Sequence, residues 1–249
     1  MPEIRLLPEN VSSKIAAGEV VERPASVVKE LVENSLDAGA TEITVEIDAG
    51  GCERISVVDN GKGIRKDDVE LAFQRFATSK VAETSDLSEI STLGFRGEAL
   101  PSIAAVSTVS LITKIRDEEL GDRLIVTDGE ILDTQLYGAP DGTSVAVNNL
   151  FQNFPARRKF LRAVATEFSR VRSFIVRYAL AYPEVKFRLV ADGSESLTTI
   201  GSGDLREAIV SIYGLDVGQA MLEISYDSEN IDSEKINVTG MVSPPSIHR

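Results

Sequence analysis

Three polar residues near the N-terminus, Glu30, Asn34 and Asp37, are of types that do chemistry together. Glu30 and Asn34 are four positions apart and Asp37 follows three positions later, so a helix would place them on nearly one face. A carboxylate there can accept a proton from an attacking water, and the neighbouring amide oxygen can bind Mg²⁺, which prefers oxygen ligands. The alternative is a solvated helix face on which Lys29 and Glu33 are also ordinary surface charges.

A second polar segment, Asp59 to Gly63, directly follows a predicted strand. A carboxylate at a strand end can accept a hydrogen bond from the exocyclic amine of adenine, and glycines let the backbone approach a flat base closely. The alternative is a tight Asn-Gly turn. The segment is not a Walker A loop, because no glycine stands five positions before Gly61 and Gly63 replaces the required Ser or Thr.

A third segment, Gly94 to Leu100, is a glycine loop that runs into a predicted helix. Free backbone N–H groups and the helix dipole at such a start favour a phosphate, although a plain N-cap loop is the alternative. The residues before it, Thr78–Gly97, are polar and rich in Ser, Thr and Gly. A loop of about 20 residues in a compact domain usually has a function, so we expect a lid over a ligand.

The elements that must position these segments follow from hydrophobic periodicity and from glycine and proline breaks. Helices are expected at about 26–37, 67–76, 98–106, 165–181 and 205–213. Strands are expected at about 41–48, 54–59, 108–114, 123–127, 131–136, 143–148, 186–191, 222–226 and 236–242. Gly201–Asp204 is expected to be a linker, and the elements after it are too few for a domain of their own.

Composition narrows the class of protein. The hydrophobic share of 43% is enough for a core, no run of about 18 apolar residues suggests a membrane span, and the N-terminus has no signal-peptide pattern. Cys52 is the single cysteine, which suits a reducing cytoplasm and, with one histidine in the chain, argues against a zinc site.

A net charge of −13 argues against coating of nucleic acid by bulk charge, but a local basic groove remains open. Seven basic residues and a single acid lie between Ala156 and Tyr178, so the Arg157–Arg177 region is a candidate DNA contact. The alternative is that these arginines are surface charges that balance an acidic chain.

The three polar segments, in this order and spacing, resemble the ATPase module shared by gyrase, heat-shock chaperones, sensor kinases and MutL, the GHKL group. The match narrows to the MutL mismatch-repair family over further segments, namely Ile15–Pro24, Lys29–Gly39, Arg75–Lys80, Leu93–Leu100, Asn149–Phe151 and Pro155–Leu161. The resemblance covers roughly residues 1–200 strongly and 201–249 weakly. The Ile15–Pro24 and Pro155–Leu161 segments argue against a histidine kinase or a chaperone relative.

The resemblance implies a role for each matched position. Glu30 is implied as the general base, Asn34 as the Mg²⁺ ligand, and Asp59 as the group that recognises adenine. The positions implied to bind ATP or Mg²⁺ are Asn34, Asp37, Asp59, Gly61, Gly63, Thr78, Ser79, Lys80, Gly94, Phe95, Arg96, Gly97, Glu98, Ala99, Leu100 and Thr143.

The resemblance also implies the architecture. It predicts an α+β fold of the GHKL (Bergerat) type, an α/β sandwich whose mixed, mostly antiparallel sheet carries helices on one face. Residues 1–200 would form the ATPase domain, with an N-terminal arm at 1–24 and an ATP lid at 78–97. Residues 205–249 would begin a truncated second, transducer domain. The lysine that this domain usually supplies to the terminal phosphate has no match here, so hydrolysis is expected to be weak or absent.

The function implied is that of a nucleotide-gated switch in a bacterial cytoplasm, associated with the nucleoid during repair. ATP binding would order the lid and arm and drive homodimerisation, which couples mismatch recognition by MutS to a downstream nuclease or helicase. A non-enzymatic nucleotide-binding scaffold for repair partners or DNA is the alternative. Glu30 distinguishes the two, since a pure binder needs no base beside Asn34.

Overall fold

The computed structural model describes residues 17–18, 20–81, 83, 92–227 and 236–247. In the predicted arm, residues 1–16 and 19 lie outside the described residues, and in the predicted lid residues 82 and 84–91 do.

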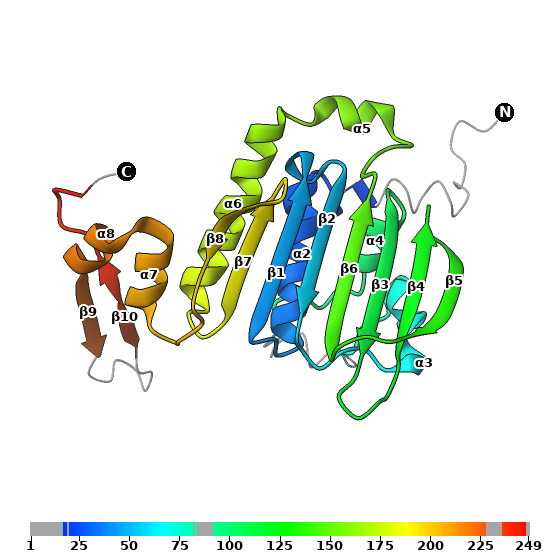
Figure 1. Cartoon of the computed structure of the whole chain (residues 1–249), viewed down its shortest axis with the longest axis horizontal. Helices are drawn as coiled ribbons and strands as arrows, with labels where there is room; N and C mark the ends of the chain where they lie inside the picture. Colours follow the sequence, from blue (N-terminus) through cyan, green and yellow to red (C-terminus); the bar gives the residue numbers. More distant parts are fainter. Residues whose placement is uncertain (1–16, 19, 82, 84–91, 228–235, 248–249) are drawn as a thin grey trace.

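A single eight-stranded sheet organises residues 42–198 (Figure 1). Its strands are β1 (Glu42–Asp48), β2 (Arg54–Asp59), β3 (Thr108–Lys114), β4 (Gly121–Thr127), β5 (Glu130–Tyr137), β6 (Gly142–Asn148), β7 (Lys186–Ala191) and β8 (Ser194–Thr198). Their order is β5-β4-β3-β6-β2-β1-β7-β8. Among the described strands of this sheet, β1 and β7 pair in parallel and all other neighbours are antiparallel. The predicted mixed, mostly antiparallel α+β fold is therefore confirmed.

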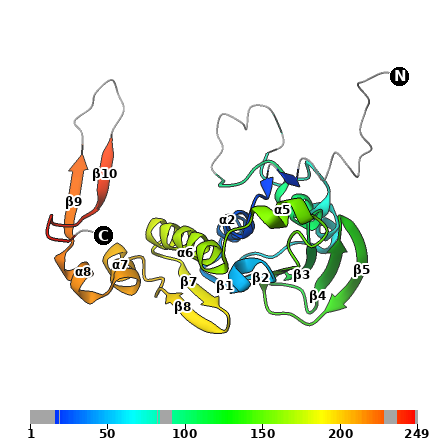
Figure 2. The same ribbon diagram turned by 90° about the horizontal axis from the view of Figure 1, so that it is seen from above.

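Helices cover one face of this sheet (Figure 2). They are α2 (Pro24–Asp37), α3 (Lys66–Val69), α4 (Ala99–Ala104) and α6 (Val164–Ala181), with short 3₁₀ turns η1 (Ala49–Gly51) and η2 (Leu71–Phe73). Helix α5 (Pro155–Phe160) lies at the end of the sheet (Figure 1). Helix α2 packs on β2 and α6, and α6 packs on β7. Among the described residues, no helix combines the length and the apolar character needed to span a membrane.

Local sequence explains the two elements nearest the polar segments. Helix α2 begins at Pro24, whose fixed φ suits a first turn, and it ends before Gly39, which has a left-handed φ of +72°. Strand β1 alternates, and its inward residues Ile43, Val45 and Ile47 are buried as the period of two predicts. The core therefore fills the space between this sheet face and the buried side of α2.

The single helix expected at 67–76 is wrong. The chain forms α3 and η2 instead, because Gln74 is extended and Phe76 has a left-handed φ of +64°, neither of which continues a helix. Helix α5 was not expected, since six residues are too few to show a helical period. Strand β8 was not expected either, because Ser194–Thr198 has no alternating pattern and owes its shape to pairing with β7.

The described part of the arm packs on its own chain. Ala17 and Val21 are fully buried in the core. The guanidinium of Arg157 in α5 lies so close over Gly18 that a side chain at that glycine would collide with it. The prediction that the arm, residues 1–24, packs across a partner stays a prediction.

A second, smaller group of elements follows the linker Gly201–Asp204 (Figure 1). It consists of α7 (Leu205–Tyr213), α8 (Leu215–Ala220), β9 (Leu222–Asp227) and β10 (Asn237–Val242). Strands β9 and β10 pair only with each other among the described strands, and most of their side chains are exposed. The division into an ATPase domain and the start of a second domain stays a prediction.

Candidate active site

The C-terminal turn of α2 holds a cation in this structure. The ammonium of Lys80 donates hydrogen bonds to Asn34 Oδ1 at 3.0 Å and to Asp37 Oδ2 at 2.6 Å. Asp37 is nearly buried, with 7% of its side chain exposed, and this ion pair compensates its charge. Two oxygen donors of α2 thus converge on one positive charge that comes from the predicted lid.

Asp37 also fastens the other end of the lid. Its Oδ1 accepts the backbone N–H of Leu93 at 2.9 Å, and its Oδ2 accepts that of Gly94 at 3.1 Å. The N–H groups at the start of the predicted phosphate loop therefore bind an anion, which here is a carboxylate. A side chain at position 94 would lie 3.3 Å from Lys80 Nζ, so glycine at this position leaves space for the lysine ammonium.

Glu30 lies one turn before Asn34 on α2. Its carboxylate Oε1 accepts a hydrogen bond from Lys29 Nζ at 3.1 Å, and a quarter of its side chain is exposed. It makes no described contact with Lys80, so it is not part of the cation cluster. A carboxylate that keeps contact with solvent is in position to meet a water molecule.

Asp59 stands at the end of β2 in a second polar cluster. Its Oδ2 accepts the hydroxyl of Ser35 at 2.7 Å, and its Oδ1 accepts the N–H groups of Gly61 at 2.8 Å and Thr143 at 3.3 Å. Thr143 is the register partner of Asp59 on β6. Burial raises the pKa of Asp59, and these three hydrogen bonds work in the opposite direction.

The loop after Asp59 approaches two neighbouring segments. A side chain at position 61 would come within 2.9 Å of the Ala38 Cβ. Gly63 has a left-handed φ of +73°, and a side chain there would collide with the Lys114 carbonyl. The hydroxyl of Thr113 accepts the N–H of Ile64 at 2.8 Å. It also lies 3.1 Å from the Thr143 hydroxyl. The loop is thereby fixed to the sheet, with its glycines at the closest approaches.

The segment from Gly97 to Leu100 leads into α4. Gly97 has a left-handed φ of +61°, its carbonyl accepts the N–H of Phe76 at 2.9 Å, and a Cβ there would meet the Ala77 carbonyl at 2.6 Å. Glu98 is the residue before the helix, and Ala99 and Leu100 form its first turn. Only glycine fits where the end of the lid crosses the segment at Phe76 and Ala77.

Other predicted binding residues lie at the edge of the cluster. Thr78 and Ser79 are exposed, and the Thr78 hydroxyl accepts the backbone N–H of Lys80 at 3.2 Å. The guanidinium of Arg96 lies 5.7 Å from the ring centre of Phe95. The structure thus brings Asn34, Asp37, Lys80 and Gly94 together, whereas Thr78, Ser79, Phe95 and Arg96 make no hydrogen bond to α2 among the described contacts.

Two residues of the site were missed from the sequence. Thr113 carried a signal, because it follows Val109 and Leu111 on the inward side of an alternating strand, where a polar residue is unusual. Ser35 carried none, since its partner Asp59 is 24 positions away and only the packing of α2 on β2 brings them together.

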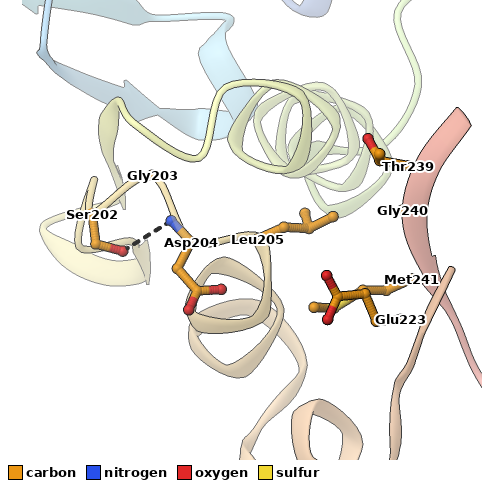
Figure 3. A pocket seen from close by; sticks show the side chains of 8 residues that line it. All are labelled: Ser202, Gly203, Asp204, Leu205, Glu223, Thr239, Gly240 and Met241. Carbon is orange, nitrogen blue, oxygen red and sulfur yellow. Dashed lines mark hydrogen bonds between the residues drawn. The ribbon is translucent and has the colours of Figure 1, made fainter. Parts of the chain in front are cut away.

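A further hollow lies outside this site (Figure 3). It is lined by the linker and the small sheet, through Ser202, Gly203, Asp204, Leu205, Glu223, Thr239, Gly240 and Met241. Asp204 caps α7 by accepting the N–H of Arg206 at 2.7 Å. None of the predicted site residues lines this hollow, so it has no part in the candidate active site.

Comparison with known proteins bears on the whole chain. A family model described as "Histidine kinase-, DNA gyrase B-, and HSP90-like ATPase" matches residues 22–137. The DNA mismatch repair protein MutL of Streptococcus thermophilus is 47% identical over all 249 residues, and that of Halothermothrix orenii is 45% identical. The chain spans 38% of the length of each of these relatives.

Solved structures of similar proteins also point to MutL. The Aquifex aeolicus MutL ATPase domain complexed with ADP matches 83% of this chain and 73% of its own, with a TM-score of 0.69 and 38% identity. The N-terminal domain of a DNA repair protein matches 93% of this chain and 70% of its own, with a TM-score of 0.78 and 29% identity. The chain therefore belongs to the MutL family of DNA mismatch repair proteins and contains the family's GHKL-type ATPase domain.

Proposed function

We propose that this chain binds ATP with Mg²⁺ and slowly hydrolyses it to ADP and phosphate. The observation that carries the proposal is that α2 contacts both polar clusters: Ser35 bonds Asp59, while Asn34 and Asp37 bond Lys80 of the lid. Helix α2 therefore connects the cluster around Asp59, where a base would bind, with the cluster around Lys80, where phosphates would bind. The printed description of the Aquifex aeolicus relative, which is complexed with ADP, supports the same ligand.

Asp59 is proposed to recognise adenine. Its carboxylate accepts three hydrogen bonds, and a carboxylate has about four acceptor positions, so one position is left for the exocyclic amine of the base. Gly61 and Gly63 in the loop after Asp59, and Thr143, its register partner on β6, are proposed to line the base. Burial of Asp59 favours an occupant that satisfies its remaining acceptor position.

The phosphates are proposed to lie between the end of α2 and the lid. Lys80 and the N–H groups of Leu93 and Gly94 already hold an anion there, and a phosphate is the same kind of partner. Asn34 Oδ1 fits a Mg²⁺ ligand, because it is an oxygen donor that binds a cation in this structure. When bound, Mg²⁺ would neutralise charge on the phosphates.

Glu30 is proposed as the general base. It accepts a proton from the water whose oxygen attacks the terminal phosphorus, while the bond from that phosphorus to the ADP oxygen breaks. Phosphate and ADP leave, and the proton passes from Glu30 to solvent. The partial exposure of Glu30 gives the attacking water access.

The wider role is proposed from family membership. ATP binding orders the lid and the arm, and two N-terminal regions then dimerise, which couples mismatch recognition by MutS to a downstream nuclease or helicase. The setting is a bacterial cytoplasm, with association to the nucleoid during repair. Residues 205–249 are proposed to begin the second domain, and the exposed apolar residues Leu222, Ile224 and Tyr226 of β9 support a further covering layer.

DNA contact through the Arg157–Arg177 region is a second proposal. Helix α5 and the segment that links it to α6 present exposed basic residues close together, namely Arg158 and Lys159 in α5 and Arg162 in the link. In Figure 1 α5 lies at the end of the sheet, with α6 running down beside it. A basic surface on an acidic chain suits a local contact with the phosphate backbone.

Hydrolysis is tested by comparing the wild-type chain with Glu30→Ala. We expect both to bind ATP, while phosphate release by Glu30→Ala falls to background because no other group takes the proton. Glu184→Ala, which removes an exposed carboxylate beyond the end of α6, is the matched control and should hydrolyse like the wild type. Equal phosphate release by wild type and Glu30→Ala would leave only the scaffold alternative.

A further inference from the structure

Glu33 is a carboxylate on α2 that the proposed chemistry does not use. It lies three positions after Glu30, and only 8% of the residue is exposed. A carboxylate is seldom buried without a partner that compensates its charge. The hydrogen-bond partners of Glu33 therefore indicate its role.

Glu33 joins two helices through hydrogen bonds on both of its oxygens. Its Oε1 accepts the hydroxyl of Tyr178 in α6 at 2.6 Å, and its Oε2 accepts Lys29 Nζ at 2.7 Å. The same ammonium donates to Glu30 Oε1 at 3.1 Å. A continuous chain of four side chains thus runs from α6 to the proposed general base.

The charges fix the direction of each bond. Burial raises the pKa of Tyr178, and the hydrogen bond to Glu33 raises it further, so the hydroxyl stays protonated and donates. Burial acts to lower the pKa of Lys29, but the bond to Glu33 and the nearby Glu30 outweigh it and leave that pKa raised. Lys29 therefore remains a cation between two carboxylates. In each of these hydrogen bonds the donor is the tyrosine hydroxyl or the lysine ammonium, and the acceptor is a carboxylate.

The chain of hydrogen bonds from Tyr178 to Glu30 also restricts the motion of these side chains. A lysine on a helix surface has many rotamers, and one that paired only with its neighbour Glu30 would leave both side chains mobile. Here Glu33 is anchored by a hydroxyl from α6, a helix that packs on α2 and on the sheet. The position of Lys29, and through it that of Glu30, is set by the contact between the two helices.

We infer that Tyr178 and Glu33, acting through Lys29, are positioning residues that hold the Glu30 carboxylate in its catalytic place. The inference rests on the proposed hydrolysis by Glu30. A displacement of about 1 Å at a catalytic group can cost on the order of 100-fold in rate. Loss of the anchor should therefore slow the chemical step and leave ATP binding unchanged.

The test uses Tyr178→Phe, which removes the anchoring hydroxyl and keeps the ring. Single-turnover hydrolysis should slow by about tenfold, while the Kd for a non-hydrolysable ATP analogue stays within about twofold of wild type. The matched control is Tyr182→Phe, because Tyr182 stacks on Tyr178 with ring centres 6.5 Å apart and belongs to no part of the chain of bonds. It should hydrolyse at the wild-type rate.

Lys29→Met cuts the same chain of bonds at a different side chain, which is 37% exposed, and provides a second variant should Tyr178→Phe fail to fold. We expect a similar loss of rate, and the double variant should be no slower than the slower single variant, since both break one chain. Additive losses would contradict the inference.

Other results would overturn it. If Tyr178→Phe hydrolyses at the rate of Tyr182→Phe, or if it weakens ATP binding without slowing the chemical step, Tyr178 has only a structural role. Faster hydrolysis by Lys29→Met would show that Lys29 restrains the base. A wild-type rate no higher than that of Glu30→Ala is a different failure: it removes the proposed hydrolysis itself, and the inference with it.

Discussion

At the scale of single residues, Asp59 combines a structural and a binding role. Its three hydrogen bonds join α2, the loop at Gly61 and strand β6. Burial is the main cause of its raised pKa. The ionised form is the acceptor that adenine needs, so the environment that shapes the site also makes it sensitive to acid.

We expect the affinity for ATP to fall as the pH is lowered from about 7 to the ordinary Asp pKa of about 3.9, with the fall beginning above that pKa. The raised pKa of Asp59 means that protonation begins at a higher pH than for an exposed aspartate, and the protonated carboxyl has less acceptor capacity. Titration calorimetry at each pH measures the Kd.

Asp59→Asn is the control for this pH dependence. It should bind ATP at least about tenfold more weakly, because its amide nitrogen cannot accept a hydrogen bond, and its residual affinity should vary less with pH. A wild-type affinity that does not change over the same range would contradict the assignment of Asp59 to adenine.

At the scale of elements, one residue of α2, Asp37, contacts both described ends of the lid. Asp37 binds Lys80 at one end and the N–H groups of Leu93 and Gly94 at the other. A ligand that competes for these groups would release both ends of the lid together. In the absence of nucleotide, the Asp37 carboxylate thus occupies the groups that are proposed to bind the phosphates.

Asp37→Ala should free the lid in the absence of nucleotide. Hydrogen bonds to a charged group contribute about 1.5–3 kcal/mol, so the amides of Leu93 and Gly94 should exchange with solvent more than about tenfold faster. Hydrogen exchange measured by NMR tests this. The amide of Phe76, which bonds the Gly97 carbonyl at 2.9 Å and not Asp37, is the internal control. Unchanged exchange at Leu93 and Gly94 would mean that Asp37 does not hold the lid.

At the scale of the whole molecule, charge is distributed unevenly. The chain has a net charge of −13, yet α5 and the segment that links it to α6 carry exposed Arg158, Lys159 and Arg162. The acidic remainder repels DNA elsewhere on the surface, so DNA binding would be confined to this region.

Binding to single-stranded DNA should weaken steeply with salt. Replacing both Arg158 and Lys159 by Gln should lower the slope of log K against log salt by about 0.7 for each phosphate that the variant no longer neutralises. The matched control is Lys66→Gln, since Lys66 is exposed in α3, outside the basic region. Binding that is undetectable or insensitive to salt, or an equal effect of Lys66→Gln, would remove the proposed DNA interaction.

Periodic segments were predictable because their pattern is local. The alternation of β1 and the apolar spacing of α6 each appear within about one element's length. The region from Lys66 to Phe76 was not, because a helical composition there is overruled by the left-handed Phe76 and by the crossing at Gly97. Strand β8 was missed for the same kind of reason, since its partner β7 determines it.

The sequence by itself determined most of the elements and the polar segments, since residue types and spacing along one helix or strand are local properties, and the α+β class followed from the resemblance that those segments carry. Tertiary structure decided which of those residues meet. It joined Ser35 to Asp59 and Lys80 to Asn34 across the fold, and it turned Glu33 from a surface charge into a buried link to Tyr178. Such contacts depend on how α2 packs on β2 and α6, and no spacing along the chain encodes that packing.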